Sequence, residues 1–217
     1  MWRFTPESAR YSVHVDPEQH APTPSIGRRG SYAKGVARRT EILDRAIEVF
    51  RERGADGTSL RSIAAAIGVS HAALLHYFDS REQLLIAVYA HQGAGSDGDA
   101  AVDAQRTAVD VMVHAASENV RVPGLVKLYS TLVAASLESS SELGKAYFTE
   151  RFERLRLDLA ERLRAEQRQG TVRTDVDPMQ IAALIIAASD GLQIQWLLEP
   201  SIELEDTLRV LATLLEP

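Results

Sequence analysis

Histidine and serine are the residues of this chain best suited to catalytic or metal chemistry, and their spacing supports neither. His71 and His76 lie five residues apart, so on a helix with about 100° per residue their side chains diverge by about 140° and do not easily share one ion. No histidine pair has the H-E-x-x-H spacing, and no serine stands in a G-x-S-x-G elbow. The chain has no cysteine, which removes thiol nucleophiles, disulfides and cysteine metal sites. We therefore expect no enzyme activity, no metal and no cofactor.

A glycine-rich segment, residues 93–98, matches the G-x-G-x-x-G pattern of dinucleotide sites. That pattern holds a pyrophosphate only where a strand precedes it and a helix begins after it. Here the preceding residues have helical periodicity, and the sequence shows no strand. We interpret residues 93–99 as a hinge.

The charge of the chain is unevenly distributed. Residues 28–92 carry a net charge of +3, whereas residues 93–217 carry −8. A locally basic segment in an acidic chain is typical of a domain that contacts a phosphate backbone. Five basic residues without an intervening acidic one open this segment: Arg28, Arg29, Lys34, Arg38 and Arg39.

Two short predicted helices, residues 59–67 and 71–78, are joined by a turn that contains glycine, which is the helix-turn-helix arrangement. On the second helix Leu74 and Phe78 lie about 40° apart and predict the buried face. The opposite face is rich in small residues, which let a helix lie deep in a major groove. It presents Ala72, Ala73 and His76, with His71 and Leu75 at its edges.

From Ala37 to Tyr89 the sequence resembles the N-terminal domain of the TetR family of transcriptional regulators. The motifs that carry the resemblance are the IA-x-x-x-GVS turn (Ile63, Ala64, Gly68, Val69, Ser70), the L-x-x-x-F frame (Leu74, Phe78) and the S-basic-x-x-L opening of the next helix (Ser80, Arg81, Leu84). The resemblance implies a homodimeric repressor that leaves a palindromic DNA operator when a small-molecule effector binds.

The same resemblance implies which residues approach DNA. The family usually has tyrosine where this chain has Leu75, and leucine cannot donate a hydrogen bond to phosphate, so a thymine methyl is the substitute contact. Because this face has few hydrogen-bonding groups, we expect His71, Arg61 and DNA shape to supply much of the specificity. The expected DNA-binding set is Arg38, Arg39, Ser59, Arg61, Ser70, His71, Ala72, Ala73, Leu75, His76, Tyr77 and Arg81.

The periodicity after about residue 33 predicts an all-α fold, because apolar residues recur at three and four and no alternating run occurs. Beyond the hinge we expect helices near residues 100–120, 124–137, 141–169, 178–197 and 203–215. The predicted division is a flexible tail (1–27), a helix-turn-helix DNA-binding domain (28–92), the hinge (93–99) and a ligand-binding and dimerisation domain (100–217).

In the last of these parts the resemblance implies an effector site inside the helices and a dimer interface made by two helices of each chain. Polar or adaptable residues in apolar helices are the ligand-binding candidates: Met112, His114, Tyr129, Asp190, Gln193 and Trp196. The dimer candidates are Phe148, Phe152, Leu155, Leu159, Leu184, Ala188 and Gln195. For the first four of these, a core seam within one chain is the alternative.

The longest apolar run, residues 181–198, is interrupted by polar residues and falls short of the roughly 20 apolar residues that span a bilayer. The start of the chain lacks the apolar block of a secretory signal, so we expect a cytoplasmic protein without a membrane partner. Two other interpretations stay open, namely a helical adaptor that binds a protein rather than DNA and an enzyme whose site has no recognised motif.

Overall fold

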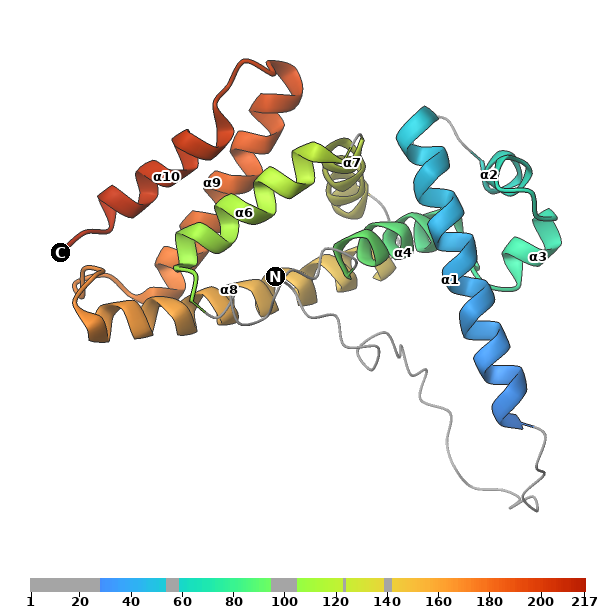
Figure 1. Ribbon diagram of the computed structural model, residues 1–217, viewed down its shortest axis with the longest axis horizontal. Coiled ribbons are helices and arrows are strands. Elements are labelled where there is room, and N and C mark those ends of the chain that lie inside the picture. Colours follow the sequence, from blue (N-terminus) through green and yellow to red (C-terminus); the bar gives the residue numbers. More distant parts are fainter. Residues whose placement is uncertain (1–27, 54–58, 95–104, 123, 139–141) are drawn as a thin grey trace.

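The computed structural model describes residues 28–53, 59–94, 105–122, 124–138 and 142–217, and within these ranges it contains helices and no strand (Figure 1). The all-α prediction is confirmed. The predicted tail and most of the hinge lie outside the described residues, while Gly93 and Ala94 belong to a helix. The helices are α1 (Arg28–Arg53), α2 (Leu60–Ala66), α3 (His71–Leu75), α4 (Arg81–Ala94), α6 (Ala108–Arg121), α7 (Leu125–Glu138), α8 (Glu142–Gln169), α9 (Pro178–Leu198) and α10 (Leu204–Leu214).

Serine side chains cap the N-termini of the two short helices, α2 and α3. The Ser59 hydroxyl accepts a hydrogen bond from the Ser62 amide at 3.1 Å, and Ser62 Oγ accepts one from the Ser59 amide at 2.8 Å. This reciprocal pair is a capping box. Ser70 caps α3 by accepting from the Ala73 amide at 3.0 Å. Between the two helices Gly68 has φ +72°, a conformation that favours glycine.

A first apolar core holds the N-terminal helices together and reaches beyond them. Ile42 of α1, Ile63 of α2, Leu74 of α3 and Leu84 of α4 are fully buried in it. The same core includes residues of α7 and of the first turns of α8: Leu125, Leu128, Tyr129, Leu132, Tyr147 and Phe148. The N-terminal helices are therefore connected to α7 and α8 through α4, which packs on both.

A second apolar core lies among α6, α8, α9 and α10. Val111, Leu163, Ile185 and Leu208 contribute one buried side chain from each of these helices. Asp177 caps the start of α9, since its side chain accepts from the amides of residues 179 and 180, and Pro178 takes the first helical position. In Figure 1 α2 and α3 lie at one end of the molecule and α10 at the other, with the long α8 running between the two parts.

Candidate nucleic-acid interface and internal cavity

The orientation of α3 agrees with the helical wheel. Leu74, and Phe78 just after the helix, are fully buried and anchor it to the first core. Ala72 and His76 are exposed, and the Leu75 side chain is 41% exposed. A short helix thus turns a face of small and apolar side chains outward, away from the chain that supports it.

The serine and tyrosine candidates around α3 have structural partners. The side chains of Ser59 and Ser70 serve as helix caps. The Tyr77 ring packs edge-on against the His76 ring, with the centroids 5.1 Å apart. His71 and Ala73 are half-exposed at the start of α3. These contacts hold the shape of the surface that DNA would meet.

The arginine candidates differ in their surroundings. Arg61 is exposed on α2, and Arg81 is half-exposed at the first residue of α4. Arg38 pairs with Glu41 at 2.5 Å. The Arg39 guanidinium lies over the Phe78 ring, 4.9 Å from its centroid, and burial lowers its pKa. Arg39 is exposed like Arg61, but it also packs on Phe78, the residue that anchors the end of α3.

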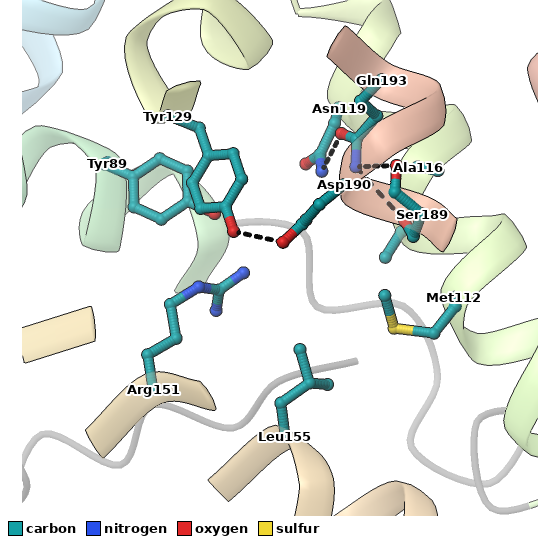
Figure 2. A pocket seen from close by; sticks show the side chains of 11 residues that line it. Tyr89, Met112, Ala116, Asn119, Tyr129, Arg151, Leu155, Ser189, Asp190 and Gln193 are labelled. Carbon is teal, nitrogen blue, oxygen red and sulfur yellow. Dashed lines mark hydrogen bonds between the residues drawn. The ribbon is translucent and has the colours of Figure 1, made fainter. Parts of the chain in front are cut away.

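A cavity lies between α4, α6, α7, α8 and α9 (Figure 2). Its volume is about 20 Å³, which is room for about one water molecule. Its apolar lining includes Met112, Ala116 and Leu155. The rest is polar or aromatic and includes Tyr89, Asn119, Tyr129, Arg151, Ser189, Asp190 and Gln193.

Most polar groups of the cavity are joined to one another. The Tyr129 hydroxyl donates to Asp190 Oδ2 at 2.9 Å. Asn119 Nδ2 donates to Gln193 Oε1 at 3.0 Å, and Gln193 Nε2 in turn donates to the Ser189 carbonyl oxygen at 3.2 Å (Figure 2). Burial raises the pKa of the Asp190 carboxyl, although the hydrogen bond from Tyr129 and the charge of Arg151 oppose it. Burial and the neighbouring Asp190 also raise the pKa of Tyr129, which keeps its hydroxyl protonated as a donor.

Arg151 of α8 is the charged group that faces these residues from the other side. Its guanidinium carbon lies 5.3 Å from the ring centroid of Tyr89 and 5.8 Å from that of Tyr129. Its Nε is shut off from solvent and has no hydrogen-bond partner among the described residues. Aromatic faces attract a guanidinium but accept no strong hydrogen bond from Nε, so this donor is left unsatisfied.

The structure brings four of the six ligand-binding candidates to the cavity wall: Met112, Tyr129, Asp190 and Gln193. His114 and Trp196 do not line it, and Trp196 instead packs against the second core. Sequence reasoning missed Tyr89 and Arg151. A signal for Arg151 was present, because it falls three residues after Phe148 and four before Leu155 on the inner face of α8.

The dimer candidates on α8 require a correction. Phe148, Leu155 and Leu159 are buried within the single chain, and Phe152 packs between the two cores. This stripe is the intrachain seam, because α7 and α9 cover it, and it is not available to a second chain. On α9, by contrast, Leu184 is 65% exposed, Gln195 is exposed and Ala188 is half-exposed.

α9 is long and apolar enough to cross a membrane, and α6 with α7 passes the same test only as a pair bent by 106°. Both lie within the helical packing, where α9 contacts α6, α8 and α10 and leaves one apolar side uncovered. In the described parts of the chain no group of three or more histidine or acidic side chains has the geometry of a metal site.

Family models of known proteins match both the N-terminal and the C-terminal part of the chain. A family model described as "Bacterial regulatory proteins, tetR family" matches residues 42–88, and one described as "BetI-type transcriptional repressor, C-terminal" matches residues 144–216. Together the two models match more than half of the chain.

Two curated relatives are similar over different lengths. The HTH-type transcriptional repressor KstR2 of Rhodococcus jostii is 48% identical over 48 residues, which is 22% of this chain and only 24% of that protein. The HTH-type transcriptional repressor Rv1474c of Mycobacterium tuberculosis is 27% identical over 159 residues, which is 72% of this chain and 81% of that protein.

Solved structures share the fold. A putative TetR-family regulator from Rhodococcus sp. has a TM-score of 0.65 at 19% identity, over 82% of this chain and 98% of that one. Thermus thermophilus FadR, a TetR-family repressor solved in complex with lauroyl-CoA, has a TM-score of 0.59 at 23% identity, over 81% and 92% of the two chains. With a helix-turn-helix that matches one model and a C-terminal part that matches the other, the chain belongs to the TetR family of transcriptional regulators.

Proposed function

We propose that this protein is a transcriptional repressor that binds duplex DNA by placing α3 in a major groove. The observation that carries the proposal is the outward face of α3, where Ala72, Leu75 and His76 are exposed while Leu74 and Phe78 fix the helix from beneath. Small side chains allow close approach to the bases, and Arg61 on the adjacent helix supplies a phosphate contact. The proposal includes the division into a DNA-binding part (residues 28–92) and a regulatory part (residues 100–217), in a cytoplasmic protein.

The functional unit in this proposal is a homodimer. Two reading helices that engage successive major-groove faces need a separation of roughly 34 to 36 Å, which a two-fold dimer on a palindromic operator provides. The uncovered side of α9 is the surface that we assign to this contact, because Leu184, Ile194 and Leu198 are exposed along it. In a two-fold dimer formed on this side, both chains would contribute the same apolar stripe of α9 to the interface.

The cavity is the proposed effector site. It lies against Tyr89 of α4, and α4 packs on α1 and shares the first core with α3. A molecule with different affinity for two positions of α4 would shift the spacing of the reading helices and release the operator. Two similar structures hold a ligand, lauroyl-CoA in one and choline in another, which supports a ligand-controlled regulator without naming the effector of this chain.

A salt titration of duplex binding tests the proposed function. The wild-type protein is expected to bind duplexes selected for affinity more tightly than random duplexes, with an affinity that falls steeply as salt rises. Arg61→Ala should weaken binding to all duplexes alike and reduce the salt slope by about one. The matched control is Arg154→Ala on α8, which should leave the slope unchanged. Failure to bind any duplex at low salt would reject the proposal, and capture of a protein partner in that case would favour the adaptor interpretation.

A further inference from the structure

We propose that the cavity recognises an organic carboxylate, whose anionic group pairs with Arg151 and whose short apolar body lies against Met112 and Leu155. This inference rests on the proposed function, because it names the chemical class of the effector. It starts from the one donor of the cavity wall that the structure shows to be shut off from solvent and unsatisfied.

The other polar side chains of the cavity already have partners. Tyr129 donates to Asp190, Asn119 donates to Gln193, and Gln193 donates to the Ser189 carbonyl. A new ligand gains little from groups that must first give up a bond to each other. Arg151 differs from them, because its Nε has no acceptor among the described residues. An incoming acceptor would satisfy this donor without breaking a hydrogen bond in the wall.

The positive charge of the Arg151 guanidinium favours an anionic ligand over a neutral hydrogen-bond acceptor. Arginine keeps its proton in proteins, and a cation removed from water is costly unless a negative group is near. Asp190 offsets this cost only in part, since burial raises the pKa of its carboxyl and the Tyr129 hydroxyl already engages one of its oxygens. A carboxylate matches the guanidinium fork with two parallel hydrogen bonds, which an amide or an alcohol cannot do.

The shape of the cavity selects the rest of the molecule. Figure 2 shows Arg151 and Asp190 facing a space that Met112 and Leu155 also border. The cavity volume of about 20 Å³ is room for about one water, so the body of a ligand enters as the Met112 and Leu155 side chains move apart. Leu155 lies one turn after Arg151 on α8 and Met112 lies on α6, so a ligand whose charged head pairs with Arg151 can place its apolar body against these two side chains.

Binding at Arg151 also has a path to the DNA-binding helices. The guanidinium packs on Tyr89, and Tyr89 belongs to α4. A carboxylate that draws the guanidinium toward the cavity weakens its contact with the Tyr89 ring. The two positions of Arg151 thus have different contacts with α4, which is what a ligand needs in order to shift an equilibrium.

Calorimetric titration of the full-length protein with two matched pairs of probes tests the inference. The pairs are phenylacetate with phenylacetamide and hexanoate with hexanamide, at equal ionic strength. Each pair has the same body and differs in its charge. At least one carboxylate is expected to bind, and about tenfold or more tighter than its amide, because a hydrogen bond between charged partners is worth more than one to a neutral group. Arg151→Met should abolish this preference, Arg151→Lys should retain part of it, and Arg154→Met should leave it unchanged.

Several results would overturn the inference: equal affinity for acid and amide, no binding of any probe, or a preference that survives in Arg151→Met. Far-UV circular dichroism and duplex binding of each variant establish that it is folded, and the lysine variant tests the charge if the methionine variant is not. If a carboxylate binds through Arg151 but the protein binds no duplex, the anion site stands and the proposed function fails. If the protein binds duplex but shows no preference for acids, the proposed function stands and the carboxylate assignment fails.

Discussion

Tyr89 of α4 stacks on Tyr129 of α7, with the ring centroids 5.3 Å apart and the ring planes at 25°. The pair joins two parts of the molecule, because α4 packs on the helix-turn-helix while Tyr129 donates a hydrogen bond across the cavity to Asp190 of α9. The wall of the cavity and the last helix of the DNA-binding part therefore share one aromatic contact.

A double-mutant cycle measures this contact. We expect Tyr89→Leu and Tyr129→Leu to be coupled by about 0.5–1.5 kcal/mol in the free energy of unfolding, since a stacked aromatic pair contributes that much beyond the area that it buries. Urea denaturation of the two single variants and the double variant gives the coupling. Additive effects of the two substitutions would show that the stack contributes nothing of its own.

Replacing Asp190 by asparagine should change stability in a pH-dependent way. Burial raises the pKa of this carboxyl in the folded protein above its pKa in the unfolded chain. The protonated carboxyl therefore contributes its full stabilisation below the unfolded-chain pKa, and this contribution is lost as pH rises through the folded-state pKa. Asp190→Asn should therefore gain stability relative to wild type at neutral pH, and the gain should shrink toward about pH 4.

Asp175→Asn is the control of opposite sign for that measurement. Arg173 lowers the pKa of the Asp175 carboxyl, so this group contributes stability above its unfolded pKa and loses it as pH falls. Urea midpoints at the two pH values decide the matter. A gain for Asp190→Asn that is equal at both would contradict the burial argument.

Gly144 and Gly35 are both helical, yet alanine should act differently at each. A Cβ at Gly144 would lie 2.5 Å from Glu82 Oε1 and 3.0 Å from Ser136 Cβ, whereas a Cβ at Gly35 meets nothing within 4 Å. We expect Gly35→Ala to stabilise the protein by about 0.5–1 kcal/mol, as alanine does in an open helix position. Gly144→Ala should destabilise it by about 1 kcal/mol, because α8 would be pushed from α4 and α7. Equal stabilisation of both variants in urea would show that this junction tolerates a methyl group.

His71 should affect which DNA sequence is preferred rather than how strongly all sequences bind. It is half-exposed at the start of α3, where its side chain would reach base edges in the proposed DNA complex. His71→Ala is expected to change the preference at one base-pair position by about 1–3 kcal/mol. Selection of duplexes from a random pool provides the measurement, with His114→Ala as the matched control. An unchanged ranking of sites would remove His71 from the reading face.

A charge on the uncovered side of α9 should disrupt the proposed dimer. Leu184 is 65% exposed there, and Leu184→Glu would place two carboxylates in a two-fold interface. Self-association measured by sedimentation should weaken about tenfold or more, which corresponds to about 1.4 kcal/mol. Leu137→Glu is the matched control, since Leu137 is 82% exposed on α7. Equal self-association of the wild type and Leu184→Glu would exclude this face.

The sequence by itself determined the helical class, the helix-turn-helix and the orientation of α3. These depend on residues close along the chain, such as the Ser70 cap, the turn at Gly68, and the spacing of Leu74 and Phe78. Periodicity and capping are local properties, so a single sequence shows them. The sequence also indicated ligand-binding candidates among the polar residues of apolar helices, and Tyr129, Asp190 and Gln193 do line the cavity.

Only the tertiary structure decided which residues meet. Tyr89 and Arg151 are 62 positions apart and form one cluster because α4 and α8 pack against each other and against α7. The stripe from Phe148 to Leu159 is apolar whether a second chain or the same chain covers it, and here α7 and α9 cover it. An apolar pattern predicts that a face is buried, but it does not identify the helix or chain that covers the face. The hydrophobic effect is non-directional, so the partner is set by how distant helices pack.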